Sequence, residues 1–312
     1  MYLVITIDVE PDCSLSWLYS NPLTFDGVQI GIGEKLQPLF NKYNICPTYL
    51  INNVVMEDAK SVSVLLNLKG HFELGAHLHP EFIEPQKKYF DYSNKRGEMN
   101  ECYLHEDVEF GKIKNITELF YKSFNRKPLS FRAGRFSAGV NTIKSLKKLG
   151  YKVDTSVTPH INWNDETREL PVDYSQAFEQ PYFIAEDSIL GKCDSDCNIL
   201  EVPVSIAKIK KIFRNEKLIW LRPVYSTYEQ MIDLIKHYQK KYKHYDFIVV
   251  NMMFHNIELI PGKSPYTKSE EECREYMKLL EKFMVFCLKE RIESVNLSKL
   301  YDISHDKKIK KN

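Results

Sequence analysis

The chain has 312 residues, of which 43% are hydrophobic, and this is enough to bury a substantial core in one large domain. Its 43 Lys and Arg residues nearly balance its 42 Asp and Glu residues, and the net charge of +1 excludes the positive field typical of proteins that bind nucleic acid or an anionic membrane. No stretch approaches the roughly 20 apolar residues of a transmembrane helix, and the N-terminus lacks the charged region and cleavage site of a signal peptide. We therefore expect a cytoplasmic protein.

The seven cysteines are scattered along the chain, and an odd number is typical of reduced thiols in a reducing compartment. Cys193 and Cys197 form the only close pair. A structural zinc site at this pair is the less favoured alternative, because no second pair or neighbouring histidine completes four ligands.

The chain begins with an apolar run, residues 2–7, that predicts a buried strand. Asp8 and Glu10 follow it, and the two-residue period of a strand places their side chains on the same side. A lone Asp after a strand is more often a cap or turn residue, which is the alternative interpretation. Residues 11–32 are rich in Asn, Pro, Gly and aromatic residues and predict a loop over the strand end.

A second strand end carries imidazoles. Residues 34–43 predict a helix, 47–51 a strand and 61–68 a helix, and the next strand, from Phe72, ends in His77 and His79. Parallel strands of an α/β domain end at one edge of the sheet, so these imidazoles and the two acids are expected to converge there. Two imidazoles and one carboxylate suit Zn²⁺ or another borderline divalent ion, and the remaining carboxylate is then free to act as a base. An H-x-H pair that binds no metal is the alternative.

The alternation of helices and strands continues to the end of the chain. Helices are expected at 108–124, 140–149, 228–242 and 269–290, and strands at 129–132, 151–153, 199–204, 246–254 and 292–295. The long connection 81–106 has no period, and residues 158–198 form an irregular insertion. We predict an α/β fold with a single domain, 1–312, because right-handed crossovers of this length close readily into a barrel.

Three further strand ends carry charged or titratable groups. Arg132 directly follows an apolar strand, where a buried charge needs a partner, and Asp8 is the candidate. Asp154 ends the next strand and His255 the strand near residue 250. The alternatives are a surface turn for Arg132 and a core histidine for His255. Together these residues supply the metal ligands, base and acid that hydrolysis of an amide or ester requires.

The motifs IDVE (7–10), GAHLHP (75–80), FRAG (131–134), DTS (154–156) and FH (254–255) resemble, in the same order and over nearly the whole chain, the five motifs of NodB-type polysaccharide deacetylases, carbohydrate esterase family four. The resemblance implies a distorted seven-stranded β/α barrel that removes acetyl groups from sugars with a divalent metal, commonly zinc. The family more often has adjacent aspartates and an H-x-x-x-H spacing. The form here resembles a divergent, cytosolic subgroup associated with bacterial surface-glycan biosynthesis.

The resemblance also implies a role for each residue of the site. Asp8 matches the general base, and His255 the general acid. The metal ligands are Glu10, His77 and His79, Arg132 pairs with the base, and Asp154 orients His255.

The hypothesis from the sequence is hydrolysis of a sugar N-acetyl amide, in which Asp8 takes a proton from a metal-activated water and His255 protonates the leaving amine. The alternatives are an inactive glycan-binding protein with the same fold and a hydrolase of another amide, such as a cyclic ureide. Trp17, Trp163, Tyr92 and Phe136 are candidates to stack on a sugar. The carrier of the sugar and the oligomeric state stay open.

Overall fold

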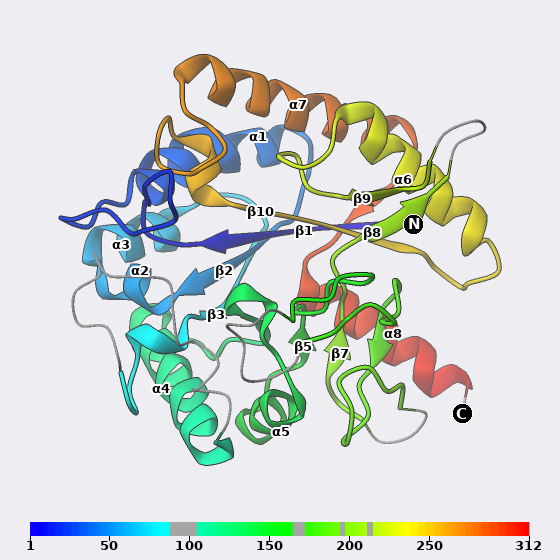
Figure 1. The fold of residues 1–312 in the computed structure, drawn as a ribbon, viewed down its shortest axis with the longest axis horizontal. Coiled ribbons are helices and arrows are strands. Elements are labelled where there is room, and N and C mark those ends of the chain that lie inside the picture. Colours follow the sequence, from blue (N-terminus) through cyan, green and yellow to red (C-terminus); the bar gives the residue numbers. More distant parts are fainter. Residues whose placement is uncertain (88–104, 165–171, 194–196, 211–214, 312) are drawn as a thin grey trace.

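The fold is seen in a computed structural model that describes residues 1–87, 105–164, 172–193, 197–210 and 215–311. A curled, mostly parallel sheet forms its centre, and helices cover its outside. Figure 1 shows α6 and α7 at the top of the view and α4 and α5 at the bottom. The predicted α/β class and barrel-like sheet are confirmed. The helices are α1 (Gln37–Lys42), α2 (Asn53–Glu57), α3 (Ala59–Asn67), α4 (Glu106–Phe124), α5 (Val140–Leu149), α6 (Tyr228–Lys241), α7 (Glu270–Lys289) and α8 (Leu297–Lys311).

In the described residues, the central sheet has nine strands, eight of them in the order β10-β1-β2-β3-β4-β5-β7-β6 and the ninth, β11, beside β1. Every pair along this path is parallel except β6 with β7. Its strands are β1 (Tyr2–Val9), β2 (Thr48–Asn52), β3 (Glu73–Leu78), β4 (Ser130–Ala133), β5 (Val153–Asp154), β6 (Tyr182–Phe183), β7 (Leu200–Glu201), β10 (Val249–His255) and β11 (Glu293–Ser294).

The sheet curls into a half-barrel. The chain after β7 runs from the β5–β7 end of the sheet to β10 at the other end. The backbone N–H of Val202 donates to Asp154 O at 2.9 Å, and that of Ser205 donates to Asn251 O in β10 at 3.0 Å. A hairpin of β8 (Ile206–Ile209) and β9 (Lys217–Trp220) follows. These few bonds bring the two ends of the curled sheet together, so the parallel strands end around one opening.

Helix α8 fills the opposite end of the half-barrel. Leu297 and Leu300 pack in one cluster with Val4 and Val249, which lie near the starts of β1 and β10. Glu73 fixes the helix, because its carboxylate accepts the backbone N–H of Ser298 at 2.9 Å. The sequence pattern does not predict this helix. Because α8 covers the N-terminal ends of the strands, their C-terminal ends are the place where a ligand site can form.

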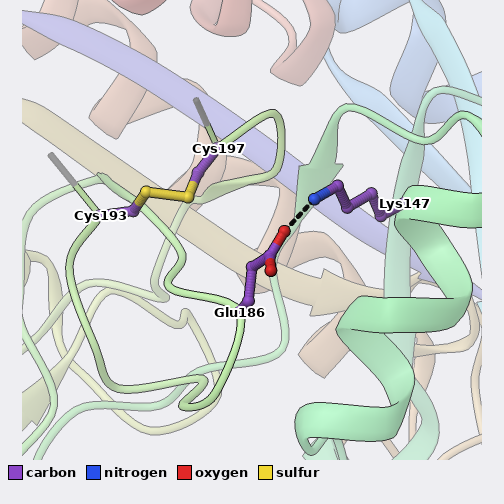
Figure 2. The surroundings of a disulfide bond; sticks show 4 residues. All are labelled: Lys147, Glu186, Cys193 and Cys197. Atoms are coloured by element: carbon purple, nitrogen blue, oxygen red, sulfur yellow. Dashed lines mark hydrogen bonds and ion pairs between the residues drawn. A yellow bond between two sulfur atoms is a disulfide. The ribbon is translucent and has the colours of Figure 1, made fainter. Parts of the chain in front are cut away.

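Two local features differ from the sequence prediction. Residues 27–32, expected in a loop, belong to the π-helix η1 (Gly27–Leu36), which begins where the Asp12 carboxylate accepts the backbone N–H groups of Asp26 and Gly27. Cys193 and Cys197 form a disulfide where reduced thiols were expected (Figure 2). The same view shows the ion pair of Lys147 in α5 with Glu186.

None of the helices in the described ranges has both the length and the hydrophobicity of a membrane span.

Candidate active site

The predicted site residues lie at adjacent C-terminal strand ends. In the sheet register, Asp8 of β1 is opposite His255 of β10, and His77 of β3 is opposite Arg132 of β4. Asp154 of β5 pairs with Phe131, one residue before Arg132. All five side chains are buried. The convergence expected from parallel strands is therefore present in the structure.

Glu10, His77 and His79 form a compact cluster of possible metal ligands. The Nε2 atoms of His77 and His79 lie 3.1 and 2.9 Å from Glu10 Oε1, and 3.2 Å from each other. Tetrahedral ligands about 2.0–2.1 Å from an ion are about 3.3 Å apart, so these separations fit a small divalent cation. Two imidazoles and one carboxylate, with a further position open, are also the donor set of catalytic zinc sites.

The other ring nitrogen of each imidazole is held away from the cluster. His77 Nδ1–H donates to the backbone oxygen of Arg132 at 3.0 Å. His79 Nδ1 lies 3.5 Å from the Glu81 carboxylate, which also binds the Arg135 guanidinium at 2.9 Å. Such partners fix the orientation of a ligand imidazole and direct Nε2 toward the metal. Glu81 and Arg135 were not predicted, although Glu81 follows His79 by two residues.

The charges of the cluster shift its pKa values in opposite directions. Burial alone would raise the pKa of Glu10, but the charge of His79 and the hydrogen bonds from both imidazoles hold it well below its usual range. Burial alone would lower the pKa of His79, but Glu10 outweighs that effect and raises it to about 9. The Arg135 charge overcomes burial at Glu81 and lowers its pKa to about 2. Two ionised carboxylates thus surround His79, an environment that also favours a cation.

Asn256 fixes the backbone of Glu10 from the neighbouring strand end. Its side-chain oxygen accepts the Glu10 N–H at 2.9 Å, and its amide donates to Glu10 O at 3.0 Å. Gly27 packs against this amide, and a Cβ at that position would lie 2.7 Å from Asn256 Nδ2. The glycine permits the close approach that holds the first candidate ligand in place.

Asp8 and Arg132 form a buried ion pair beside the cluster. Arg132 NH1 donates to Asp8 Oδ1 at 2.7 Å, and Arg132 also donates to Thr155 O at 2.9 Å and to Thr6 Oγ1 at 2.8 Å. The Asp8 partner proposed for Arg132 from sequence is therefore observed. Burial alone would raise the pKa of Asp8, but the Arg132 charge, helped by His77 and His255, lowers it below its ordinary value. Asp8 is thus an ionised carboxylate at neutral pH.

His255 faces the cluster through one nitrogen and a buried carboxylate through the other. Its Nε2 lies 3.9 Å from Asp8 Oδ2 and 4.0 Å from Glu10 Oε1. Its Nδ1 lies 3.1 Å from Glu258 Oε1 and 3.2 Å from Arg222 NH2. Burial alone would raise the pKa of Glu258, but Arg222 and His255 lower it. The histidine is held by a charged, fully buried acid.

Asp154 is not the acid that contacts His255. Its Oδ1 accepts the Ser156 hydroxyl at 2.7 Å, and its other contact is Glu201, its neighbour in the β5–β7 register. Burial raises the pKa of Asp154, and burial together with Asp154 raises that of Glu201 well above its usual range. The two carboxyl groups can therefore share a proton. The orienting contact that the resemblance implied for Asp154 is made by Glu258 instead.

Glu258 and Arg222 were not predicted from the sequence, for different reasons. Glu258 lies three residues after His255 in η5 (Asn256–Leu259), so its proximity to the strand end was an available signal. Arg222 follows β9, a strand outside the central sheet that the helix and strand pattern did not predict. Tyr92, one of the aromatic candidates, lies outside the described residues.

Comparison with solved structures identifies the fold. A protein from Mycobacterium smegmatis described as a polysaccharide deacetylase aligns with a TM-score of 0.57 and 15% identity, over 98% of this chain and 91% of that chain. One from Pseudomonas aeruginosa, also described as a polysaccharide deacetylase, aligns at 0.55 and 12% identity, over 98% and 90%. The chain has the polysaccharide deacetylase fold.

An allantoinase shares this deacetylase fold at a TM-score of 0.55 and 11% identity, over 98% of this chain and 89% of that chain. No protein-family model and no curated protein matches the sequence. The predicted resemblance to NodB-type deacetylases is confirmed at the level of the fold.

Proposed function

We propose that the protein is a metal-dependent hydrolase that removes an N-acetyl group from a sugar in surface-glycan biosynthesis. The proposal rests on the geometry of five side chains. The donor atoms of Glu10, His77 and His79 are separated as the ligands of a tetrahedral metal ion would be. The Asp8 carboxylate and His255 Nε2 lie beside them. Binding alone requires neither a base nor an acid next to a metal, so this arrangement favours turnover over the inactive alternative.

The cluster is the proposed metal site, with zinc as the expected ion. A divalent cation supplies Lewis-acid polarisation of an acyl carbonyl and lowers the pKa of water from about 15.7 toward about 7. With the metal bound, His77 and His79 would donate through neutral Nε2 atoms, and His79 would release the proton that its pKa of about 9 gives it in the metal-free protein. Glu10 would provide one negative charge. Asp8 is kept out of this set by Arg132, which occupies one of its oxygens.

The chain's own groups move the protons. Asp8 is the proposed base: its ionised carboxylate takes a proton from the attacking water, and Arg132 holds it in position. His255 is the proposed acid and donates from Nε2 to the leaving nitrogen. Glu258 accepts the Nδ1–H and stabilises the charged imidazole, the role first expected of Asp154. The C–N bond breaks, one water is consumed, and acetate and an amino sugar are released.

Acetate release tests the proposal. Purified protein supplied with Zn²⁺ is incubated with N-acetylated monosaccharides, nucleotide sugars and oligosaccharides, with allantoin as a ureide control, and acetate is measured against the Asp8→Asn variant. We expect acetate from at least one amino sugar with the wild type only. Release of no acetate from any of them, or equal release by Asp8→Asn, overturns the proposal, and turnover of allantoin alone would favour the ureide alternative.

A further inference from the structure

Helix α4 holds the segment 80–86, which follows His79 and carries Glu81. Lys112 of this helix is fully buried, and its ammonium group lies against the segment. The ammonium donates to three backbone oxygens of the segment, those of Pro80 at 2.8 Å, Ile83 at 2.6 Å and Gln86 at 3.3 Å. One charged group therefore ties three points of a short segment to the helix.

Two neighbours of Lys112 on the same helix strengthen this contact. Asn115 Nδ2 donates to Glu84 O at 2.7 Å. Gly111 lies against Pro85, and a Cβ at Gly111 would lie 2.8 Å from Pro85 Cγ and 2.9 Å from its Cδ. Because a proline ring is rigid, any side chain there would push the segment away from the helix. These three residues of α4 therefore hold the segment closely against the helix.

Packing alone does not explain the burial of this lysine. Burying an ammonium group costs free energy unless its N–H groups find acceptors. A methionine at Lys112 would have nearly the same length and would fill the space without that cost. The ammonium group, unlike a thioether, can hold several carbonyl oxygens in place. The charge of Lys112 is therefore best explained by the segment that it fixes.

The carbonyl groups that Lys112 holds lie on both sides of Glu81. The Pro80 oxygen belongs to the peptide that joins Pro80 to Glu81, and Ile83 follows Glu81 by two residues. The buried Glu81 carboxylate lies 3.5 Å from His79 Nδ1. A carboxylate in this position orients the imidazole and directs Nε2 toward the metal cluster. Lys112 is thus linked to the cluster through Glu81.

We propose that Lys112 is a positioning residue of the metal site: its ammonium group fixes the segment 80–86, and the segment holds Glu81 against His79. This inference rests on the proposed function, because it concerns the metal that the cluster would bind. Lys112 is not itself a ligand and acts through Glu81.

Zinc affinity tests this role without turnover. Lys112→Met removes the ammonium group and keeps the length of the side chain, and we expect the Kd for Zn²⁺, measured by competition with a chelating dye, to rise by about tenfold. Lys114→Met is the matched control on the same helix, because Lys114 is exposed and makes only a 3.7 Å ion pair with Glu118. Its zinc affinity should equal that of the wild type.

A double variant separates this role from a general loss of stability. Glu81→Gln keeps the shape of the side chain and removes the charge that faces His79, so it should also raise the Kd for Zn²⁺ by about tenfold. Because Lys112 acts through Glu81, the variant that combines both changes should bind zinc no more weakly than the weaker of the two single variants. Independent effects would instead multiply to about 100-fold.

Gly111→Ala provides a second way to displace the segment. Alanine favours a helix over glycine, whereas the added methyl group pushes Pro85 away from α4. We expect the Kd for Zn²⁺ to rise in this variant while the helix is kept. If Lys112→Met does not fold, Gly111→Ala takes its place in both comparisons.

Wild-type zinc affinity in folded Lys112→Met, or in Gly111→Ala where it takes that place, would overturn the inference and leave the metal site standing. Effects that multiply in the double variant would overturn it as well. If zinc binds as expected but no substrate releases acetate, the proposed hydrolysis fails and the role of Lys112 stands. A wild type that binds no zinc would overturn both.

Discussion

Asp8 and Glu10 are two residues apart in the sequence, yet their partners give them different chemistry. The Asp8 carboxylate is bound by Arg132, whereas Glu10 faces two imidazoles. Both pKa values are lowered, so both groups are ionised at neutral pH. Only Glu10 has the geometry of a metal ligand in the cluster, and this difference assigns ligation to Glu10 and proton transfer to Asp8.

The Asp8→Asn variant tests this division of roles. The amide keeps the shape of the side chain but cannot take a proton, and the three metal donors are untouched. We expect metal affinity within a few-fold of the wild type and a loss of at least about 10²-fold in kcat, the lower limit for a positioned base. Metal titration and acetate release on the same preparation measure both. A wild-type rate in Asp8→Asn would remove Asp8 from the mechanism.

Glu258 and Asp154 provide a matched pair for the orientation of His255. Glu258→Gln leaves an amide at Nδ1 and removes the charge that stabilises the imidazolium formed in the reaction, so we expect kcat to fall by about 10²-fold. Asp154→Asn should leave kcat unchanged, because Asp154 contacts Ser156 and Glu201 instead of His255. A larger loss in Asp154→Asn than in Glu258→Gln would restore the role that the sequence resemblance implied.

At the scale of elements, the spacing between β3 and β4 sets the position of His79. Gly134 follows β4, and a Cβ there would lie 2.7 Å from Leu78 O and 3.1 Å from the His79 ring. A contact under 3.0 Å with backbone oxygen requires a shift. The glycine of the FRAG motif is therefore explained by the close approach of β3, and its effect reaches the metal cluster through His79.

Gly134→Ala should weaken metal binding without unfolding the protein. The added methyl displaces His79 Nε2 from the cluster, and we expect the Kd for Zn²⁺ to rise by about tenfold to 100-fold, the usual cost of disturbing the support of a ligand. Gly139→Ala is the control, because no atom lies within 4 Å of a Cβ at Gly139. Equal zinc affinity in the two variants would show that the close approach does not position His79.

The contact between α4 and α5 buries a carboxyl group with no charged partner. Burial raises the pKa of Glu109 to about 8 despite the hydrogen bond from Thr142, against an ordinary value of 4.5. The folded protein therefore holds a proton that the unfolded chain releases above about pH 4.5. The stability that depends on this proton is full below that pH and is lost as the pH rises to about 8.

Glu109→Gln should remove this pH dependence. Relative to the variant, the free energy of unfolding of the wild type should fall by up to about 1.4 kcal/mol for each pH unit between about 4.5 and about 8. Urea denaturation of both proteins across this range measures the difference. A constant difference between the two curves would mean that Glu109 titrates normally in the folded state.

At the scale of the molecule, strand ends and side-chain parity predicted most of the site. Asp8, His77, Arg132 and His255 could be found because each directly ends an apolar strand. Glu258 lies three residues after His255 and could have been proposed from that proximity, whereas Arg222 could not, because it follows a hairpin whose position depends on tertiary contacts. The hydrogen bond from Ser205 to Asn251, which joins the two ends of the sheet, also depends on packing between distant segments. The same is true of the position of α8 against the N-terminal ends of the strands. Cytosolic location and membership of the divergent subgroup stay predictions.

The central claim is that Glu10, His77 and His79 bind one divalent metal while Asp8 remains free. Anomalous diffraction at the zinc edge, from crystals of the full chain grown with Zn²⁺, tests it most directly. We expect one strong peak about 2.0–2.2 Å from a Glu10 carboxylate oxygen and from the Nε2 atoms of His77 and His79, with Asp8 still paired to Arg132. Absence of a peak at this cluster under saturating zinc, or a peak bound by Asp8 in place of Glu10, would contradict the account.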